Sequence, residues 1–280
     1  MTKSNRNDET GSKSYRRVLT IAGSDSGGGA GIQADLKTFS ALGCYGMSVI
    51  TALTAQNTQG VTAIHPVPAG FVRQQLEAVL SDIGADAVKI GMLFSPELIK
   101  TVAETLAEFQ VKNVVLDPVM VATSGDKLLQ DDAITAIIEH LIPMADILTP
   151  NLPEASVLAA CELNSRESLE KAAKNLASSG CGNILIKGGH LTGQSSDDLL
   201  YMAAEKRFIE LKGERVATSN THGTGCTLSS AIASFIARDY ETEAAIVEAK
   251  SYIQGAIKAG AAYRIGEGRG PVHHFYQNWS

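Results

Sequence analysis

Short apolar runs rich in β-branched residues alternate with helical patterns along the whole sequence. "RVLTIAG" and "NVVLDPV" are typical of buried strands, whereas "GIQADLKTFSALG" and "SPELIKTVAETLAEF" place apolar residues at helical spacing. Strands that alternate with helices form a mostly parallel sheet with helices packed on both faces. The sequence therefore predicts an α/β fold built as a three-layer α/β/α sandwich.

The individual elements can be placed along the chain from their end signals. Ser95 is expected to cap a helix that has Pro96 at its first position. Further strands are expected at "YGMSVITAL", "DAVKIGM", "ADILTPN" and "NILIKGG". "DLLYMA" and "RFIELKGERV" predict an antiparallel pair at the edge of the sheet, and two last helices are expected to begin near Gly225 and Thr242.

Composition and linker length predict one domain. The chain has 280 residues, of which 44% are hydrophobic and 19% charged, and its connections are short. We expect residues 1–14, which are polar throughout, to be a flexible extension, and residues 15–280 to form the domain. The formal charge of −6 argues against nucleic acid or an anionic membrane as the main partner. Four scattered cysteines without a C-x-x-C pair are typical of reduced thiols in a cytoplasmic protein and disfavour a zinc site.

Ligands of parallel sheets bind beyond the carboxyl ends of the strands, and a glycine-rich loop stands at the first of these ends. "GSDSGGGAG" (23–31) lies between a strand and a helix but is not followed by the G-K-[ST] of a P-loop. Three consecutive glycines favour ligand contact over a simple turn. Asp25 could accept a hydrogen bond from a substrate, or it could cap the next helix.

Polar groups follow three of the later strands. Asp117 ends one strand, and Asn151 with Glu154 begins the helix after the next. Carboxylates in this position suit Mg²⁺, although Asn151 and Glu154 could equally form a capping box. Lys187 ends the strand "ILIKGGH", where it could reach a phosphate or extend its ammonium group into solvent.

The stretch "THGTGC" (221–226) leads directly into an apolar helix. Backbone N–H groups at a helix start have no internal partners, so Gly223 and Gly225 predict an anion site. The same field should lower the pKa of the Cys226 thiol, which could then act as a general base. Alternatively, Cys226 is a small apolar filler. His222 could orient this loop or contact a nucleotide.

The ordered set of motifs resembles a known family. The matching segments are "AGSDSGGGAGIQADLKT", "TALTAQNTQGV", "VKIGML", "LDPVMVATSG", "LTPNLPEA", "ILIKGGH", "NTHGTGCTLSSAIA" and "GPVHHF". Together they are similar to the hydroxymethylpyrimidine/phosphomethylpyrimidine kinases of thiamine biosynthesis, members of the ribokinase-like superfamily. The resemblance extends from about Val18 to the C-terminus.

That resemblance implies ATP and Mg²⁺ as cofactors, and two successive phosphorylations of 4-amino-5-hydroxymethyl-2-methylpyrimidine, first to the monophosphate and then to the pyrophosphate. It implies the following roles: Asp25, Gln56, Met92 and Val119 bind the pyrimidine; Asp117 and Glu154 hold Mg²⁺; Lys187, Thr221, His222 and Asn151 bind nucleotide; Gly223, Gly225 and Cys226 form the anion hole, with Cys226 as the base and Lys187 assisting catalysis. It also suggests a homodimer.

Three alternative functions compete with this one. A pyridoxal kinase of the same superfamily is the nearest, because pyridoxal also carries a hydroxymethyl group on a ring. A non-catalytic sensor needs none of the phosphoryl-transfer groups, and a nicotinamide dehydrogenase needs a different glycine spacing.

Many ribokinase relatives have Asp where Cys226 stands, and a thiol can stay neutral when a phosphorylated substrate enters.

Overall fold

The computed structural model describes residues 13–120, 132–188 and 196–279. Most of the expected N-terminal extension and part of "DPVMVATSG" lie outside these ranges, so the domain boundary near residue 14 stays a prediction. The central sheet has the strand order β10-β9-β8-β7-β6-β5-β1-β2. Its strands are β1 (Arg17–Ala22), β2 (Tyr45–Ile50), β5 (Ala87–Ile90), β6 (Val114–Leu116), β7 (Ile147–Leu148), β8 (Asn183–Ile186), β9 (Asp198–Met202) and β10 (Arg207–Leu211).

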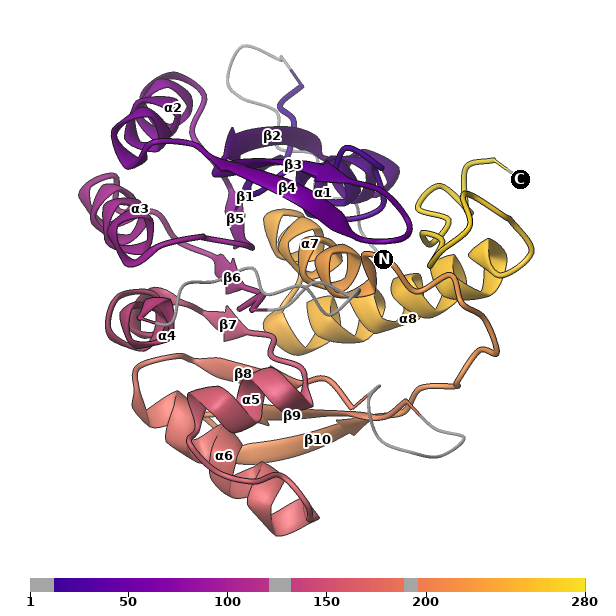
Figure 1. The fold of residues 1–280 in the computed structure, drawn as a ribbon. Coiled ribbons are helices and arrows are strands. Elements are labelled where there is room, and N and C mark those ends of the chain that lie inside the picture. Colours follow the sequence, from indigo (N-terminus) through magenta and orange to yellow (C-terminus); the bar gives the residue numbers. More distant parts are fainter. Residues whose placement is uncertain (1–12, 121–131, 189–195, 280) are drawn as a thin grey trace.

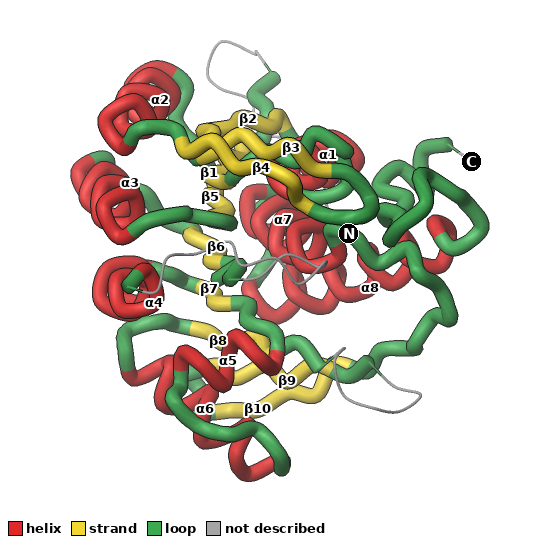
Figure 2. The backbone as a smooth tube through the Cα atoms, in the orientation of Figure 1, coloured by secondary structure: helices red, strands yellow, loops and turns green. Residues whose placement is uncertain are grey.

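The sheet is parallel from β2 to β8, and β9 and β10 add the predicted antiparallel edge. Helices cover both faces (Figures 1 and 2). One face carries α2 (Ala69–Asp82), α3 (Pro96–Glu108), α4 (Ala133–Ala136), α5 (Leu152–Leu158) and α6 (Arg166–Ser178). The other carries α1 (Gly31–Ala41), α7 (Thr224–Ala237) and α8 (Thr242–Gly260). The predicted three-layer α/β/α sandwich is confirmed.

Each face of the sheet has its own hydrophobic core. Successive side chains of a strand point to opposite faces, so Leu19 and Val88 enter the core under α2 and α3. Val18 and Ala87 enter the core under α1, α7 and α8. The same alternation places Thr20 of β1 and Lys89 of β5 on the side of α1 and α7.

The prediction of one strand at "YGMSVITAL" is wrong. The chain leaves the sheet at Thr51, whose backbone N–H donates to Ala22 and whose hydroxyl donates to the carbonyl of Met92. Beyond it, β3 (Ala52–Gln56) pairs with β4 (Val61–Pro66) in a separate two-stranded hairpin. The Ser26 hydroxyl donates to the carbonyl of Gln56, so the hairpin is tied to the glycine-rich loop.

Other local predictions are confirmed. The Ser95 hydroxyl accepts the N–H of Leu98 at the start of α3, with Pro96 in the first turn. Helices α7 and α8 begin at Thr224 and Thr242. All four cysteines are free thiols. Among the helices of the described ranges, none combines the length and apolarity needed to cross a bilayer.

Candidate active site

A cavity of about 1210 Å³ opens at the carboxyl ends of the parallel strands. It is bordered by loops that follow β1, β5, β6, β7 and β8, by the β3–β4 hairpin and by the start of α7. Every site residue predicted from the sequence lies on its wall, namely Asp25, Gln56, Met92, Asp117, Val119, Asn151, Glu154, Lys187, Thr221, His222, Gly223, Gly225 and Cys226. The fold therefore brings together groups that are up to 201 positions apart in the sequence (226 − 25).

The N-terminus of α7 is open toward this cavity. Gly223 precedes the helix with a φ of 77°, and no side chain caps the first turn. A Cβ at Gly223 would collide with the carbonyl oxygen of Gly29, so only glycine fits there. A Cβ at Gly225 would lie 3.5 Å from Lys187 Nζ and 3.6 Å from Asp117 Oδ2. Uncapped helical amides therefore face the charged groups of the site, as an anion site requires.

Asp117, Lys187 and Glu154 form a charged cluster beside these amides. Lys187 Nζ lies 2.8 Å from Asp117 Oδ1 and 3.9 Å from Glu154 Oε2. Burial raises the pKa of Asp117, but the ammonium groups of Lys187 and Lys89 outweigh it and hold that pKa below its ordinary value. Burial, opposed by Lys187 and aided by Asp117, raises the pKa of Glu154 to about 7.

Of the two alternatives for the N-x-x-E motif, the capping box is confirmed, and the Mg²⁺ role stays a prediction. The Asn151 side-chain oxygen accepts the N–H of Glu154 at 2.9 Å, and Glu154 Oε2 accepts the N–H of Asn151 at 2.7 Å. This capping box starts α5 and also holds the carboxylate of Glu154 at the cavity wall. Because the capping box uses the side-chain oxygen of Asn151, we expect the predicted nucleotide contact of Asn151 to involve its amide NH₂ group.

The carboxylates of this cluster fit Mg²⁺. Within the described ranges, no group of three or more His, Cys, Asp or Glu side chains could enclose a metal ion. Mg²⁺ does not need such an enclosure, because it keeps several waters and takes one or two carboxylates together with substrate phosphates. Asp117 and Glu154, both at the cavity wall and both beside Lys187, supply that number.

Gly27 and Gly29 of the glycine-rich loop pack against protein, and the ligand contact expected of this loop stays a prediction. Gly27–Gly29 do not line the cavity, which this loop borders through residues 23–25 and 30–31. A Cβ at Gly29 would collide with the ring of His222, and one at Gly27 would lie 3.1 Å from the Cα of Asn57. Gly27 and Gly29 are needed because the loop passes close to the hairpin and to the 221–225 loop, and Gly28 has a φ of 80°, which favours glycine.

Asp25 organises this loop from inside. Its carboxylate accepts the backbone N–H groups of Gly27, Gly29 and Ala30 at 2.8–3.0 Å and lies 2.7 Å from His222 Nε2. Burial raises the pKa of Asp25, but these donors outweigh it, so the pKa is below its ordinary value. His222 therefore joins the two loops through Asp25, in line with the orienting role considered for it, and its contact with nucleotide stays a prediction.

Cys226 borders the cavity in the first turn of α7, but its predicted ionisation is wrong. Burial raises the pKa of the thiol to about 11. The ammonium group of Lys89 opposes this, and the carboxylates of Asp35 and Asp117 add to it. Removal from water thus outweighs the nearby ammonium group, and the thiol is protonated at neutral pH.

The proposed pyrimidine pocket lies under the hairpin. Met92 and Val119 pack with Ala52 and Ile64 in a small apolar cluster at the cavity wall. The Gln56 side chain reaches the same wall and accepts a hydrogen bond from the Thr54 hydroxyl at 3.2 Å. An apolar surface with one amide beside it suits a flat heterocycle that carries donors and acceptors on its edge.

Comparison with known proteins decides the family. The family model described as phosphomethylpyrimidine kinase matches residues 25–273. The chain belongs to the phosphomethylpyrimidine kinase family. A hydroxymethylpyrimidine/phosphomethylpyrimidine kinase of Rhizobium meliloti is a relative in this family, 51% identical over 94% of the chain and 98% of the relative.

Solved structures agree with the phosphomethylpyrimidine kinase fold. The phosphomethylpyrimidine kinase of Clostridium difficile is 46% identical, with a TM-score of 0.78 over 86% of this chain and 99% of that one. The pyridoxal kinase of Staphylococcus aureus, solved with AMP-PCP and pyridoxal, is 37% identical, with a TM-score of 0.86 over 95% of both chains. The ribokinase-like architecture is thus shared by both kinds of kinase.

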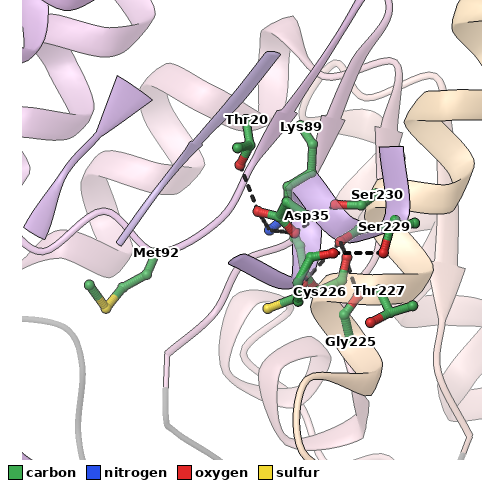
Figure 3. A network of polar contacts seen from close by, with 12 residues as sticks. Thr20, Asp35, Lys89, Met92, Gly225, Cys226, Thr227, Ser229 and Ser230 are labelled. Carbon is green, nitrogen blue, oxygen red and sulfur yellow. Dashed lines mark hydrogen bonds and ion pairs between the residues drawn. The ribbon is translucent and has the colours of Figure 1, made fainter. Parts of the chain in front are cut away.

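Sequence reasoning missed one part of this phosphomethylpyrimidine kinase site. A fully buried network joins Asp35, Lys89, Thr20 and Ser230 next to Cys226 (Figure 3). The signal was present, because Lys89 interrupts an apolar strand and Asp35 lies with Ile32 and Phe39 on the apolar side of α1. Opposite charges on two buried faces indicate an ion pair, but their distance apart in the sequence hides it.

Proposed function

We propose that this protein uses ATP and Mg²⁺ to phosphorylate 4-amino-5-hydroxymethyl-2-methylpyrimidine, first to the monophosphate and then to the pyrophosphate, in thiamine biosynthesis. One observation carries the proposal: the apolar pocket with Gln56, the uncapped amides of α7 and the Asp117–Lys187–Glu154 cluster share one cavity in a chain of this family. A binding protein without turnover would need only the first of these.

The cavity separates two tasks. Gln56, Met92 and Val119 hold the pyrimidine ring, with Asp25 shaping the loop beside it. Lys187, with Thr221, His222 and Asn151 around it, receives the phosphates of ATP. We assign the amides at Gly223 and Gly225, on the same cavity wall, to the γ-phosphoryl group as it passes from donor to acceptor.

Phosphoryl transfer then needs little covalent help from the protein. The hydroxymethyl oxygen forms a bond to the γ-phosphorus, and the bond from that phosphorus to the β,γ-bridging oxygen breaks, so that ADP leaves with the electron pair. Lys187 and the uncapped amides stabilise the charge that spreads over the transferred group. The hydroxyl proton passes to the thiolate form of Cys226.

Asp117 and Glu154 are the residues that would hold Mg²⁺, which supplies charge neutralisation to the phosphates when bound. Because the pKa of Cys226 is about 11, only about one molecule in 10⁴ carries the thiolate at pH 7. Turnover should therefore rise with pH above neutrality, as long as proton removal limits the rate.

The test is incubation of the purified protein with the hydroxymethylpyrimidine and MgATP, followed by mass analysis. We expect the monophosphate to appear first and the pyrophosphate later, with one ADP released per phosphoryl group. A protein that binds the pyrimidine and releases no ADP would overturn the proposal.

Pyridoxal kinase is the second candidate, because the Staphylococcus aureus enzyme overlays with a TM-score of 0.86 at 37% identity. Side-by-side kcat/KM values for the pyrimidine and for pyridoxal decide between the two. We also propose a cytoplasmic homodimer, which light scattering of the purified protein tests for the dimer and cell fractionation tests for the compartment.

A further inference from the structure

Lys89 and Asp35 meet because of the register of the sheet. Parallel pairing of β1 with β5 sets Thr20 beside Lys89, and strand alternation turns both toward α1 and α7. Asp35 of α1 closes the group, with Lys89 Nζ at 3.0 and 2.9 Å from its two oxygens. The Thr20 and Ser230 hydroxyls donate to the same carboxylate, each at 2.6 Å. The ammonium group is thereby held in one position.

The network of Lys89, Asp35, Thr20 and Ser230 reaches α7 one helical turn from Cys226. Ser230 and Cys226 are four residues apart in α7, so both are on one side of the helix. Side chains of a helix lean toward its N-terminus, which turns Cys226 toward the cavity, while Ser230 is fixed to Asp35. Figure 3 shows Lys89, Asp35 and the first turns of α7 gathered together. Lys89 itself forms part of the cavity wall.

A structural role alone does not explain a charge here. Both side chains are fully buried, and buried ion pairs are often no more stabilising than apolar side chains of similar volume. An ammonium group has three N–H donors, whereas Asp35 is its one recorded hydrogen-bond partner within the described ranges. Apolar side chains could therefore fill this volume beside Cys226 without a loss of stability, so the Lys89–Asp35 pair calls for another explanation.

The charged groups that act on Cys226 come from several elements. Lys89 of β5 and Lys187 after β8 favour its thiolate, and Asp35 of α1 and Asp117 after β6 oppose it. Lys89 is the strongest of the charges that act on the thiol, and burial is the larger influence against ionisation.

We propose that Lys89 is a positioning residue for catalysis, an ammonium group fixed by Asp35, Thr20 and Ser230 that stabilises the thiolate of Cys226 before this thiolate takes the proton of the acceptor hydroxyl. This inference rests on the proposed role of Cys226 as the base. It assigns opposite signs to the two members of the pair, because Lys89 supports the thiolate and Asp35 opposes it. A purely structural pair has no such asymmetry.

The test measures the alkylation rate of Cys226 by iodoacetamide at about pH 8.5, well below the pKa of the thiol, where the rate follows the thiolate fraction. Mass analysis of the Cys226 peptide separates this site from the other three cysteines. We expect Lys89→Met to slow alkylation about ten-fold and Asp35→Asn to accelerate it about three-fold, since removing a cation or an anion shifts a nearby pKa in opposite directions. Rates that change in the same direction, or not at all, overturn the proposal.

Lys250→Met is the matched control, because Lys250 forms another buried ion pair on the same cavity, 2.6 Å from Asp198. It should leave alkylation at the parental rate, and a loss equal to that of Lys89→Met overturns the proposal. If a single variant does not fold, Lys89→Met/Asp35→Asn decides: slower alkylation supports the proposal and parental alkylation overturns it. Because alkylation needs neither substrate nor turnover, this result is independent of whether the pyrimidine is phosphorylated.

Discussion

Two ion pairs lie beside the first turns of α7, and they differ in how completely their hydrogen bonds are satisfied. Asp35 receives Lys89 and two hydroxyl donors, and neither charged side chain is exposed. Asp117 also receives Lys187 and two hydroxyls, from Thr149 and Ser229, but those bonds are long, at 3.2 and 3.3 Å, and the Lys187 side chain is 15% exposed.

The difference indicates that the charge of Asp35 is fixed, whereas the charge of Asp117 is available to a ligand. A carboxylate with short bonds on all sides has no capacity left for a ligand, whereas loosely bonded groups at a cavity wall can exchange their partners when phosphates arrive. Glu154, beside Lys187, points the same way, since burial raises its pKa to about 7 even with that ammonium group 3.9 Å away.

The largest expected effect is on stability, when the buried Lys89–Asp35 ion pair is broken. Lys89→Met leaves Asp35 buried without a cation and should lower the unfolding free energy by about 3–5 kcal/mol, measured by urea denaturation. The double variant Lys89→Met/Asp35→Asn should recover most of this loss, because no unpaired charge remains. Lys212→Met removes an exposed lysine and is the control; an equal loss there would contradict the contrast.

The next largest effect is expected on catalysis, when the Lys187–Asp117 ion pair is broken. Lys187→Met should lower kcat/KM about 10²–10³-fold, because a charge aimed at the transferring phosphoryl group is lost. The unfolding free energy should fall less than in Lys89→Met, since water in the cavity can reach Asp117. Coupled ADP-release kinetics and urea denaturation on the same preparations measure both. A kcat/KM within ten-fold of the parent would place Lys187 outside the phosphate site.

A smaller effect is expected from pH acting on Glu154. Because its pKa rises from 4.5 to about 7 on folding, the folded state binds this proton more tightly, and stability is lost as pH rises from about 4.5 through about 7. Glu154→Gln keeps the capping oxygen and removes the charge, so at pH 8 in EDTA it should raise the unfolding free energy by about 2 kcal/mol. At pH 4 the two proteins should be equally stable, and a gain that is the same at both pH values would point to another cause.

The smallest effect compares the two reaction steps. Since the Cys226 thiol is neutral at pH 7, it does not repel a substrate that already carries a phosphate. Cys226→Asp adds a permanent charge and should reduce kcat/KM for the monophosphate about ten-fold more than for the hydroxymethyl substrate. Cys226→Ser, which adds no charge, is the control. Equal losses in the two steps would remove charge repulsion as the reason for a thiol here.

Much of this site could be predicted from the sequence because its motifs are local. Ser95 with Pro96, and Asn151 with Glu154, are capping signals contained within four residues, and the structure places them as expected. The exception among local motifs is the glycine-rich loop. There, Gly29 must be glycine because the ring of His222, nearly 200 residues further along the chain, packs against it. Glycine content alone cannot distinguish a ligand from a protein neighbour.

From the sequence alone, periodicity and the strand-end rule predict the alternation of strands and helices, the antiparallel edge and many of the residues that border the cavity, because these rules need no distances. Only the tertiary structure decided that Thr51 turns the chain out of the sheet, that Thr20 stands beside Lys89, and that Cys226 keeps its proton. The physical reason is that register, desolvation and charge–charge energies depend on separations between elements that meet only after folding.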